Sequence, residues 1–125
     1  MTFLPQLDRQ YLSDRGLVWE EVVDGAGKGI IIQNFCLPAG RFNVPTANIL
    51  IVLPSGYPDV PPDMFHLLPW LQMSSGVSPR ATSPTFTFQG QSWQQWSRHN
   101  NEWRPGIDGI WTMLKRVEYA LEVAA

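Results

Sequence analysis

The stretch 96–103, "WSRHNNEW", gathers residue types that can carry out acyl-transfer chemistry. Ser97 offers a hydroxyl, which is scarcely ionised at neutral pH and needs a neighbouring base to act as a nucleophile. His99 follows two residues later, and its ordinary pKa suits that task. Arg98, or the side-chain amide of Asn100, could stabilise the negative charge of a tetrahedral intermediate. The pattern therefore indicates a nucleophile, a base and an oxyanion-stabilising group within four residues.

Two alternatives to this interpretation stay open. Ser92, which follows Gly90 and Gln91, is a second candidate for the nucleophile. In the purely structural alternative, Ser97 caps a turn, His99 forms a hydrogen bond with a carbonyl group, and Arg98 lies on a solvated surface. A separation of about 3 Å between the Ser97 hydroxyl and the His99 ring would favour the catalytic interpretation.

The composition restricts the kinds of partner and site. With 9 Lys and Arg against 11 Asp and Glu, the chain has a formal net charge of −2, so no basic field exists to bind nucleic acid or an anionic membrane. The first residues lack a signal-peptide pattern, and no segment approaches the roughly 18 consecutive apolar residues of a transmembrane helix, which favours a cytoplasmic protein. Two histidines without clustered thiols or carboxylates do not make a metal site, and no cofactor is expected.

The residues around the stretch predict one α+β domain spanning residues 1–125. Apolar side chains at near-helical spacing predict a short N-terminal helix that ends near Gly16. Alternating and β-branched patterns predict three strands and a short fourth, which would form an antiparallel meander. These strands are expected at residues 16–23, 30–38, 47–54 and 63–68. Residues 72–91 are polar and rich in Ser, Thr, Pro and Gly, which predicts a long functional or mobile loop.

The end of the chain carries the clearest helical pattern. Apolar residues recur every three or four positions after Pro105, which predicts an amphipathic helix packed on the sheet. They are Ile107, Ile110, Trp111, Leu114, Val117 and Leu121. Two polar residues on predicted strands receive structural interpretations. His66 is expected to be a satisfied core histidine, and the single cysteine, Cys36, is expected to be a buried, inert side chain.

Prolines dominate the segment after the third predicted strand. Seven of the 11 prolines fall between Pro54 and Pro84, and because proline cannot donate to a β-ladder, "SGYPDVPP" is expected to be a rigid extended crossing. Four of the six tryptophans lie on residues 93–103 and the helix after them, namely Trp93, Trp96, Trp103 and Trp111. These tryptophans either pack that stretch against the helix or anchor a partner.

Two proline motifs carry a resemblance to a known family. The sequence Tyr57-Pro58-Asp59-Val60-Pro61-Pro62 follows the third strand, and Trp103-Arg104-Pro105 precedes the last helix. With these two motifs placed in this order among the predicted elements, the chain resembles a bacterial member of the ubiquitin-conjugating enzyme superfamily. The resemblance spans about Gln6 to Leu121. The resemblance implies a minimal ubiquitin-conjugating fold. That fold has an N-terminal helix, a four-stranded meander, a long active-site loop and a C-terminal helix packed on the sheet.

One departure from the family decides the expected chemistry. The family places a cysteine about eight residues before its Trp-x-Pro step, and this chain has no cysteine after Cys36. The resemblance then implies that Ser97 or Ser92 accepts the C-terminal acyl group of a ubiquitin-like modifier from an activating enzyme, as an oxyester, and passes it to a target amine. The alternative is a non-catalytic variant that binds the modifier or its activating enzyme as a scaffold. Residues expected to contact such partners are Trp93, Trp96, Trp103, Tyr57 and Pro61.

Overall fold

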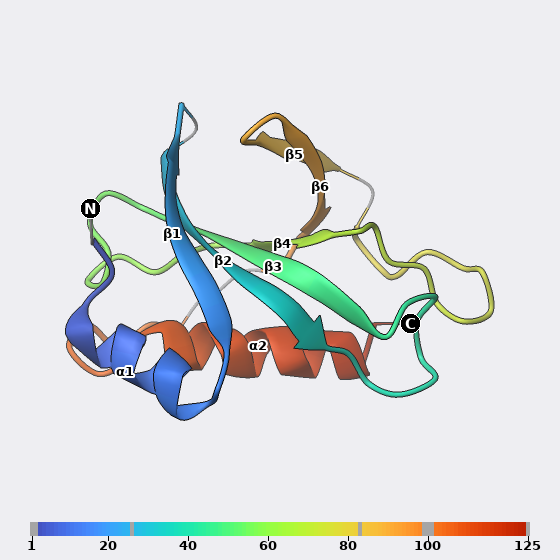
Figure 1. Cartoon of the computed structure of the whole chain (residues 1–125), viewed down its shortest axis with the longest axis horizontal. Coiled ribbons are helices and arrows are strands. Elements are labelled where there is room, and N and C mark those ends of the chain that lie inside the picture. Colours follow the sequence, from blue (N-terminus) through green and yellow to red (C-terminus); the bar gives the residue numbers. More distant parts are fainter. Residues whose placement is uncertain (1–2, 26, 83, 99–101, 125) are drawn as a thin grey trace.

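The computed structural model describes residues 3–25, 27–82, 84–98 and 102–124. Within these residues an antiparallel sheet has the strand order β1-β2-β3-β4-β6-β5. The elements are α1 (Gln6–Asp14), β1 (Val18–Asp24), β2 (Gly27–Cys36), β3 (Thr46–Leu53), β4 (Phe65–Leu68), β5 (Thr85–Phe88), β6 (Gln91–Trp96) and α2 (Ile110–Glu122). Figure 1 shows both helices on one side of the sheet. None of the helices described is long and apolar enough to cross a membrane.

The α+β class and the two terminal helices are confirmed, but the prediction of four strands and a long loop is wrong. The sheet has six strands, because the segment 72–91 contains β5 and the first residue of β6. Its Thr-Phe-Thr-Phe alternation suits a strand. Gln89 and Gly90 then have φ values of 52° and 73°, as the two central residues of a type I′ hairpin turn require. The Ser, Thr and Pro content of this segment concealed a β-hairpin.

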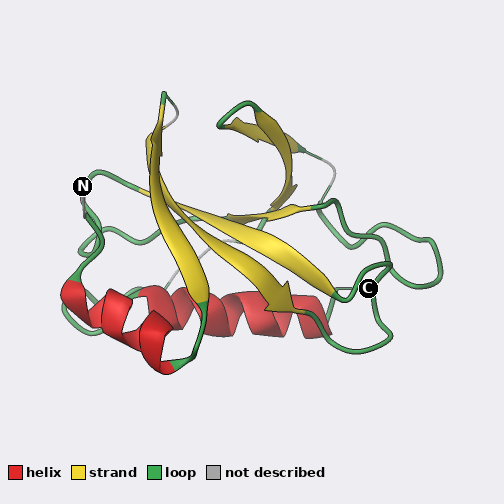
Figure 2. Ribbon diagram, viewed as in Figure 1, coloured by secondary structure: helices red, strands yellow, loops and turns green. Residues whose placement is uncertain are grey.

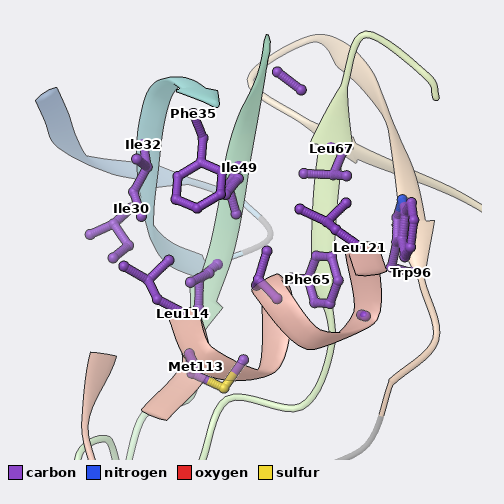
Figure 3. Packing of buried hydrophobic residues seen from close by; sticks show 14 of the residues in the cluster. Ile30, Ile32, Phe35, Ile49, Phe65, Leu67, Trp96, Met113, Leu114 and Leu121 are labelled. Atoms are coloured by element: carbon purple, nitrogen blue, oxygen red, sulfur yellow. The ribbon is translucent and has the colours of Figure 1, made fainter. Parts of the chain in front are cut away.

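The main core lies between the sheet and α2. Alternate residues of β2 and β3, among them Ile30, Ile32 and Ile49, are fully buried there. Figure 3 shows these side chains facing Met113 and Leu114 of α2. Burying each such aliphatic side chain contributes roughly 1.5–3 kcal/mol, so this layer fixes the position of α2 under the sheet.

The C-terminal helix begins later than its apolar pattern predicts. It starts at Ile110, so Ile107 lies outside it and is 61% exposed, contrary to its expected place in the buried stripe. Trp111 is only half-buried, whereas Leu114 and Leu121 lie in the core as predicted. Residues 104–108 form a turn instead of a first helical turn, because the side-chain carboxylate of Asp108 accepts a hydrogen bond from the backbone amide of Arg104.

The opposite face of the sheet is covered by its own curvature. The β5–β6 hairpin, orange in Figure 1, curls over this face, and Figure 2 shows it on the side away from both helices. Phe88 and Trp93 pack there against Leu50 in a second, smaller core. The tips of the β1–β2 and β5–β6 hairpins are joined there, because the backbone amide of Gln89 donates a hydrogen bond to the Asp24 carboxylate. At the end of β6, Trp96 pairs with Phe65, the first residue of β4 after the proline crossing.

Candidate functional site

The proline crossing is fastened to the segment that leads into α2. The indole N–H of Trp103 donates to the Pro58 carbonyl at 2.8 Å, and the Trp103 and Tyr57 rings lie with centroids 6.3 Å apart. The Tyr57–Pro58 peptide bond is cis. The two motifs that carry the family resemblance therefore form one structural unit, although 45 residues separate the partners of that hydrogen bond.

A buried carboxylate joins this unit to both helices. Asp8 is only 6% exposed; one of its oxygens accepts the Tyr57 hydroxyl and the other accepts the Ile110 amide at 3.2 Å. A negative group at the first amide of α2 is stabilised by the helix dipole. Burial, the hydrogen bond and the negative charge of Asp8 all raise the pKa of Tyr57, so its hydroxyl stays protonated and donates. At Gly109 an added Cβ would lie 2.6 Å from the Asp8 carboxylate, so the contact depends on glycine there.

A second carboxylate shapes the turn before α2. Arg104 donates to Asp108 from Nε at 3.3 Å and from Nη2 at 2.8 Å, and the Thr112 hydroxyl donates to Asp108 at 3.1 Å. The hydrogen bond from Arg104 is the largest cause that lowers the pKa of Asp108, to about 2. The Trp-Arg-Pro step is thus held on its N-terminal side by Pro58 and on its C-terminal side by Asp108.

Ser97 lies at a tight backbone turn directly after β6. Its amide donates to the Ala81 carbonyl at 3.1 Å, and the Arg98 amide donates to the Trp96 carbonyl at 2.9 Å, which is the hydrogen bond of a γ-turn centred on Ser97. Ala81 and Pro84 both lie beside the end of β6, because the backbone amide of Gln95 also donates to the Pro84 carbonyl. Ser97 is half-buried.

Arg98 lies against the core instead of on a solvated surface. Its guanidinium carbon is 5.0 Å from the centroid of the Trp96 ring, within the range of a cation–π contact. Its Nη1 donates to the Ser97 carbonyl at 3.4 Å, while Nε and Nη2 are buried without a hydrogen-bond partner in the described part of the chain. Burial lowers the pKa of Arg98, and the positive charge of Arg80 adds to that effect.

The structure brings only part of the predicted site together. Ser97 and Arg98 are adjacent at the end of β6, whereas His99 and Asn100 lie outside the described residues. Ser92 is an exposed residue of β6, five positions before Ser97, which corresponds to roughly 17 Å along a strand. The two candidate nucleophiles therefore cannot serve one site.

The residues predicted to bind a partner divide into two groups. Trp93 and Trp96 are 1% and 0% exposed, so their expected role as partner contacts is wrong. Trp96 packs in the main core with α2, as the packing alternative predicted, whereas Trp93 packs in the smaller core on the opposite face of the sheet. Their indole N–H groups donate inside the protein, to the Phe88 carbonyl and to the Gln94 side chain. Trp103, Tyr57 and Pro61 are half-buried, which leaves part of each side chain at the surface.

His66 lies beside this site in a small, mainly apolar cavity. The cavity, of about 270 Å³, is bounded by the proline crossing at Pro61, by His66 and Phe86, and by Gln95, two residues before Ser97. The His66 ring stacks on Phe86 with centroids 4.4 Å apart, and burial lowers its pKa to about 4. Its Nδ1 is buried with no hydrogen-bond partner among the described residues, so the prediction of a satisfied core histidine is wrong for this atom.

Cys36 differs from its prediction. It is exposed at the end of β2, because the strand ends there and side-chain alternation turns position 36 outward. In the strand register Cys36 pairs with Thr46 at the start of β3, whereas Trp96 lies level with Ile51 three strands away. These offsets place Cys36 roughly 20 Å from Ser97, so the single thiol belongs to no site at the end of β6. In the described ranges, no three His, Cys, Asp or Glu side chains gather as metal ligands.

Two residues of the site gave no signal in the sequence. Arg80 lies 18 positions before Arg98, and its charge acts on Arg98 because the neighbouring residue, Ala81, is bonded to Ser97. Asp8 reads as an ordinary acidic residue in the first turn of a helix, which also explains its presence there. The effect of Arg80 on Arg98 and the hydrogen bonds of Asp8 both arise between segments that lie far apart in the sequence.

Comparison with known families adds one finding. The profile of a family described as Prokaryotic E2 family E matches residues 4–124, nearly the whole chain. The α+β architecture is consistent with the ubiquitin-conjugating fold that the sequence resemblance implies. No curated protein and no solved structure matches the chain.

Proposed function

Because the chain belongs to prokaryotic E2 family E, we propose that it conjugates a ubiquitin-like modifier, with Ser97 as the acyl acceptor. Its partners are then the modifier and the adenylating enzyme that activates it. The supporting observation is the position of Ser97, at a γ-turn on the end of β6, with the guanidinium of Arg98 bonded to its carbonyl. The single thiol lies roughly 20 Å away, which leaves a hydroxyl as the candidate acceptor here.

The proposed reaction balances without a cofactor. The Ser97 Oγ attacks the carbonyl carbon of the activated tail while its proton passes to the base assigned from the sequence, His99. A new C–O bond forms, the bond to the activating enzyme breaks, and the leaving group takes up a proton. The nitrogen of a target amine then attacks the ester carbonyl and forms a C–N bond while His99 takes its proton. The C–O bond breaks, and His99 passes that proton to Ser97 Oγ. Arg98, or the amide of Asn100, stabilises the oxyanion in both steps.

The surroundings support a polypeptide tail as the substrate. The cavity at Pro61, His66 and Gln95 reaches to within two residues of Ser97, and its apolar walls favour a neutral segment of chain. His66 is neutral above about pH 4, so it adds a hydrogen-bonding group but no charge. Trp103 and Tyr57 expose part of their rings close to this cavity's proline wall and are the remaining candidates for partner contacts.

The test reconstitutes the first half of the reaction. The chain is incubated with the modifier, its activating enzyme and ATP, and the product is analysed by intact mass before and after treatment with thiol or hydroxylamine. The proposal predicts an adduct that resists thiol, yields to hydroxylamine and is lost in Ser97→Ala. An adduct that is lost in Cys36→Ser, or that persists in Ser97→Ala while Ser92→Ala removes it, would contradict the assignment of Ser97.

A second function rests on the same geometry. Since the only thiol is remote from the end of β6, the chain could bind the modifier or its activating enzyme without forming any acyl intermediate. This scaffold function predicts saturable binding, no adduct under any condition, and equal affinity of the wild type and Ser97→Ala. The two functions therefore differ in one reconstitution experiment.

A further inference from the structure

Arg98 has one edge of its guanidinium without a partner. Nη1 donates to the Ser97 carbonyl, and the plane lies against Trp96, but Nε and Nη2 are buried and unbonded within the described residues. Buried N–H groups of a cation are costly when nothing accepts their hydrogen bonds. The protein therefore holds two donors for which the described part of the chain supplies no acceptor.

These two donors match a carboxylate. Nε and Nη2 point in parallel from the same side of the guanidinium, which is the edge that binds both oxygens of a carboxylate at once. The chain contains a filled example of this geometry, because Arg104 binds Asp108 through the same two atoms, at 3.3 and 2.8 Å. Arg98 has the unfilled equivalent, with both donor atoms buried and the guanidinium lying against the Trp96 ring.

A second arginine acts electrostatically on Arg98. The positive charge of Arg80 disfavours the charged form of Arg98, and the Arg80 side chain is exposed. The position of Arg80 is fixed by its amide, which donates to the Ala124 carbonyl at 2.9 Å. Two neighbouring positive charges in a chain of net charge −2 repel one another unless an anion lies between them.

We propose that Arg98 and Arg80 form a binding site for a carboxylate of a protein partner, either the α-carboxylate of a polypeptide tail or an acidic side chain. A planar monoanion suits two parallel donors, whereas a phosphate dianion would call for further donors around its remaining oxygens. Naming the modifier's tail as the source rests on the proposed function, but the carboxylate site itself does not. In that setting the site would hold the free tail before activation or after hydrolysis.

The first test uses acetate as the probe and follows the arginine Nε–Hε signals by NMR. We expect a saturable shift of the Arg98 signal with acetate that sodium chloride at equal ionic strength does not produce. The Arg104 signal is the internal control, because its Nε is already bonded to Asp108 and should not move. An Arg98 signal that stays unchanged, or that moves equally with chloride, would overturn the proposal.

Variants then separate geometry from charge. Arg98→Lys keeps the charge but loses the parallel donors, and we expect acetate affinity to fall at least tenfold. Arg80→Ala should weaken binding about threefold, while Lys115→Ala, which removes an exposed charge on α2, should leave it unchanged. Equal affinity in the wild type and Arg98→Lys would show that charge alone attracts the anion and would contradict the site.

Peptides identify the source of the carboxylate. One peptide ends in a free carboxylate, a second is its C-terminal amide, and a third is the amide with one internal Gln replaced by Glu. Binding of the first alone indicates a tail, and binding of the third indicates an acidic side chain; failure of both would overturn the proposal. Ser97→Ala should bind the peptides normally, so a failed acyl transfer and a failed carboxylate site give different results.

Discussion

The carboxylate of Asp8 accepts the hydroxyl of Tyr57, and this contact links the N-terminal helix to the proline crossing. The same carboxylate accepts the first amide of α2. Since Trp103 is bonded to the next residue of the crossing, Pro58, one buried acidic group links the N-terminal helix, the proline crossing and the start of α2. Its loss should therefore affect both stability and the geometry of the site.

Replacing Asp8 by alanine removes the cap of α2 and leaves the Tyr57 hydroxyl without its acceptor. We expect the free energy of unfolding to fall by roughly 2–3 kcal/mol, measured by urea denaturation. Asp14→Ala, on the exposed end of the same helix, is the matched control and should change stability by less than about 0.5 kcal/mol. Equal effects of the two substitutions would show that the buried contact contributes nothing.

His66 should make stability depend on pH. Its pKa is about 4, below the value of about 6.5 for an exposed histidine, because burial disfavours the charged ring. Between these values the unfolded chain binds a proton that the folded protein does not. The stability that His66 contributes is thus complete above about pH 6.5, and roughly 3 kcal/mol is lost as the pH falls to about 4.

The difference between wild type and His66→Phe isolates this contribution. Urea denaturation at several pH values should show a smaller loss of stability for His66→Phe between pH 6.5 and 4, since phenylalanine binds no proton at this position in either state. Parallel curves for the two proteins would mean that the His66 ring is protonated freely in the folded state.

Asp108 should titrate unusually low. The hydrogen bonds from Arg104 hold its pKa at about 2, against an ordinary value of 3.8. The stability from this pair is present above about pH 3.8 and is lost as the pH falls through 2. The carboxyl carbon of Asp108, followed by NMR, should show a midpoint near 2, and Arg104→Gln should raise that midpoint. An unchanged midpoint in Arg104→Gln would assign the shift to another cause.

Two substitutions in the turn of the β5–β6 hairpin should change stability in opposite directions. Gly90→Ala places a side chain at positive φ and should cost roughly 1 kcal/mol, whereas Gln89→Asn should stabilise by roughly 0.5 kcal/mol, because asparagine adopts this conformation readily. Gly25→Ala is the control, since Gly25 has no positive φ and no atom within 4 Å of an added Cβ. Thermal unfolding distinguishes the three, and a loss for Gln89→Asn would contradict a type I′ turn.

Local patterns predicted much of the fold and little of the site. The periodic stripe at Leu114 and Leu121 and the apolar run of β3 indicated the C-terminal helix and a central strand, because burial dictates both patterns. The β5–β6 hairpin was missed, since its Thr, Ser and Pro content is typical of loops. The alternation of Thr and Phe in β5 is typical of a strand, but the surrounding composition favoured a loop.

The environment of the Arg98 side chain could not be predicted from the sequence either. A solvated Arg98 was the structural alternative, yet the side chain lies on Trp96 because β6 continues to the residue just before Ser97. Likewise, two of the tryptophans that looked like partner anchors, Trp93 and Trp96, are core residues, one on each face of β6. Which face a residue takes follows from strand register, and the register was set by a hairpin that was not predicted.

The position of the acyl group on the chain tests the central claim most directly. The wild-type adduct, formed with the modifier, its activating enzyme and ATP, is digested at mildly acidic pH, and tandem mass spectrometry locates the modified residue. We predict the tail's acyl group on the Ser97 hydroxyl. A modified Ser92 or Cys36, or no modified residue while the modifier still binds, would contradict it.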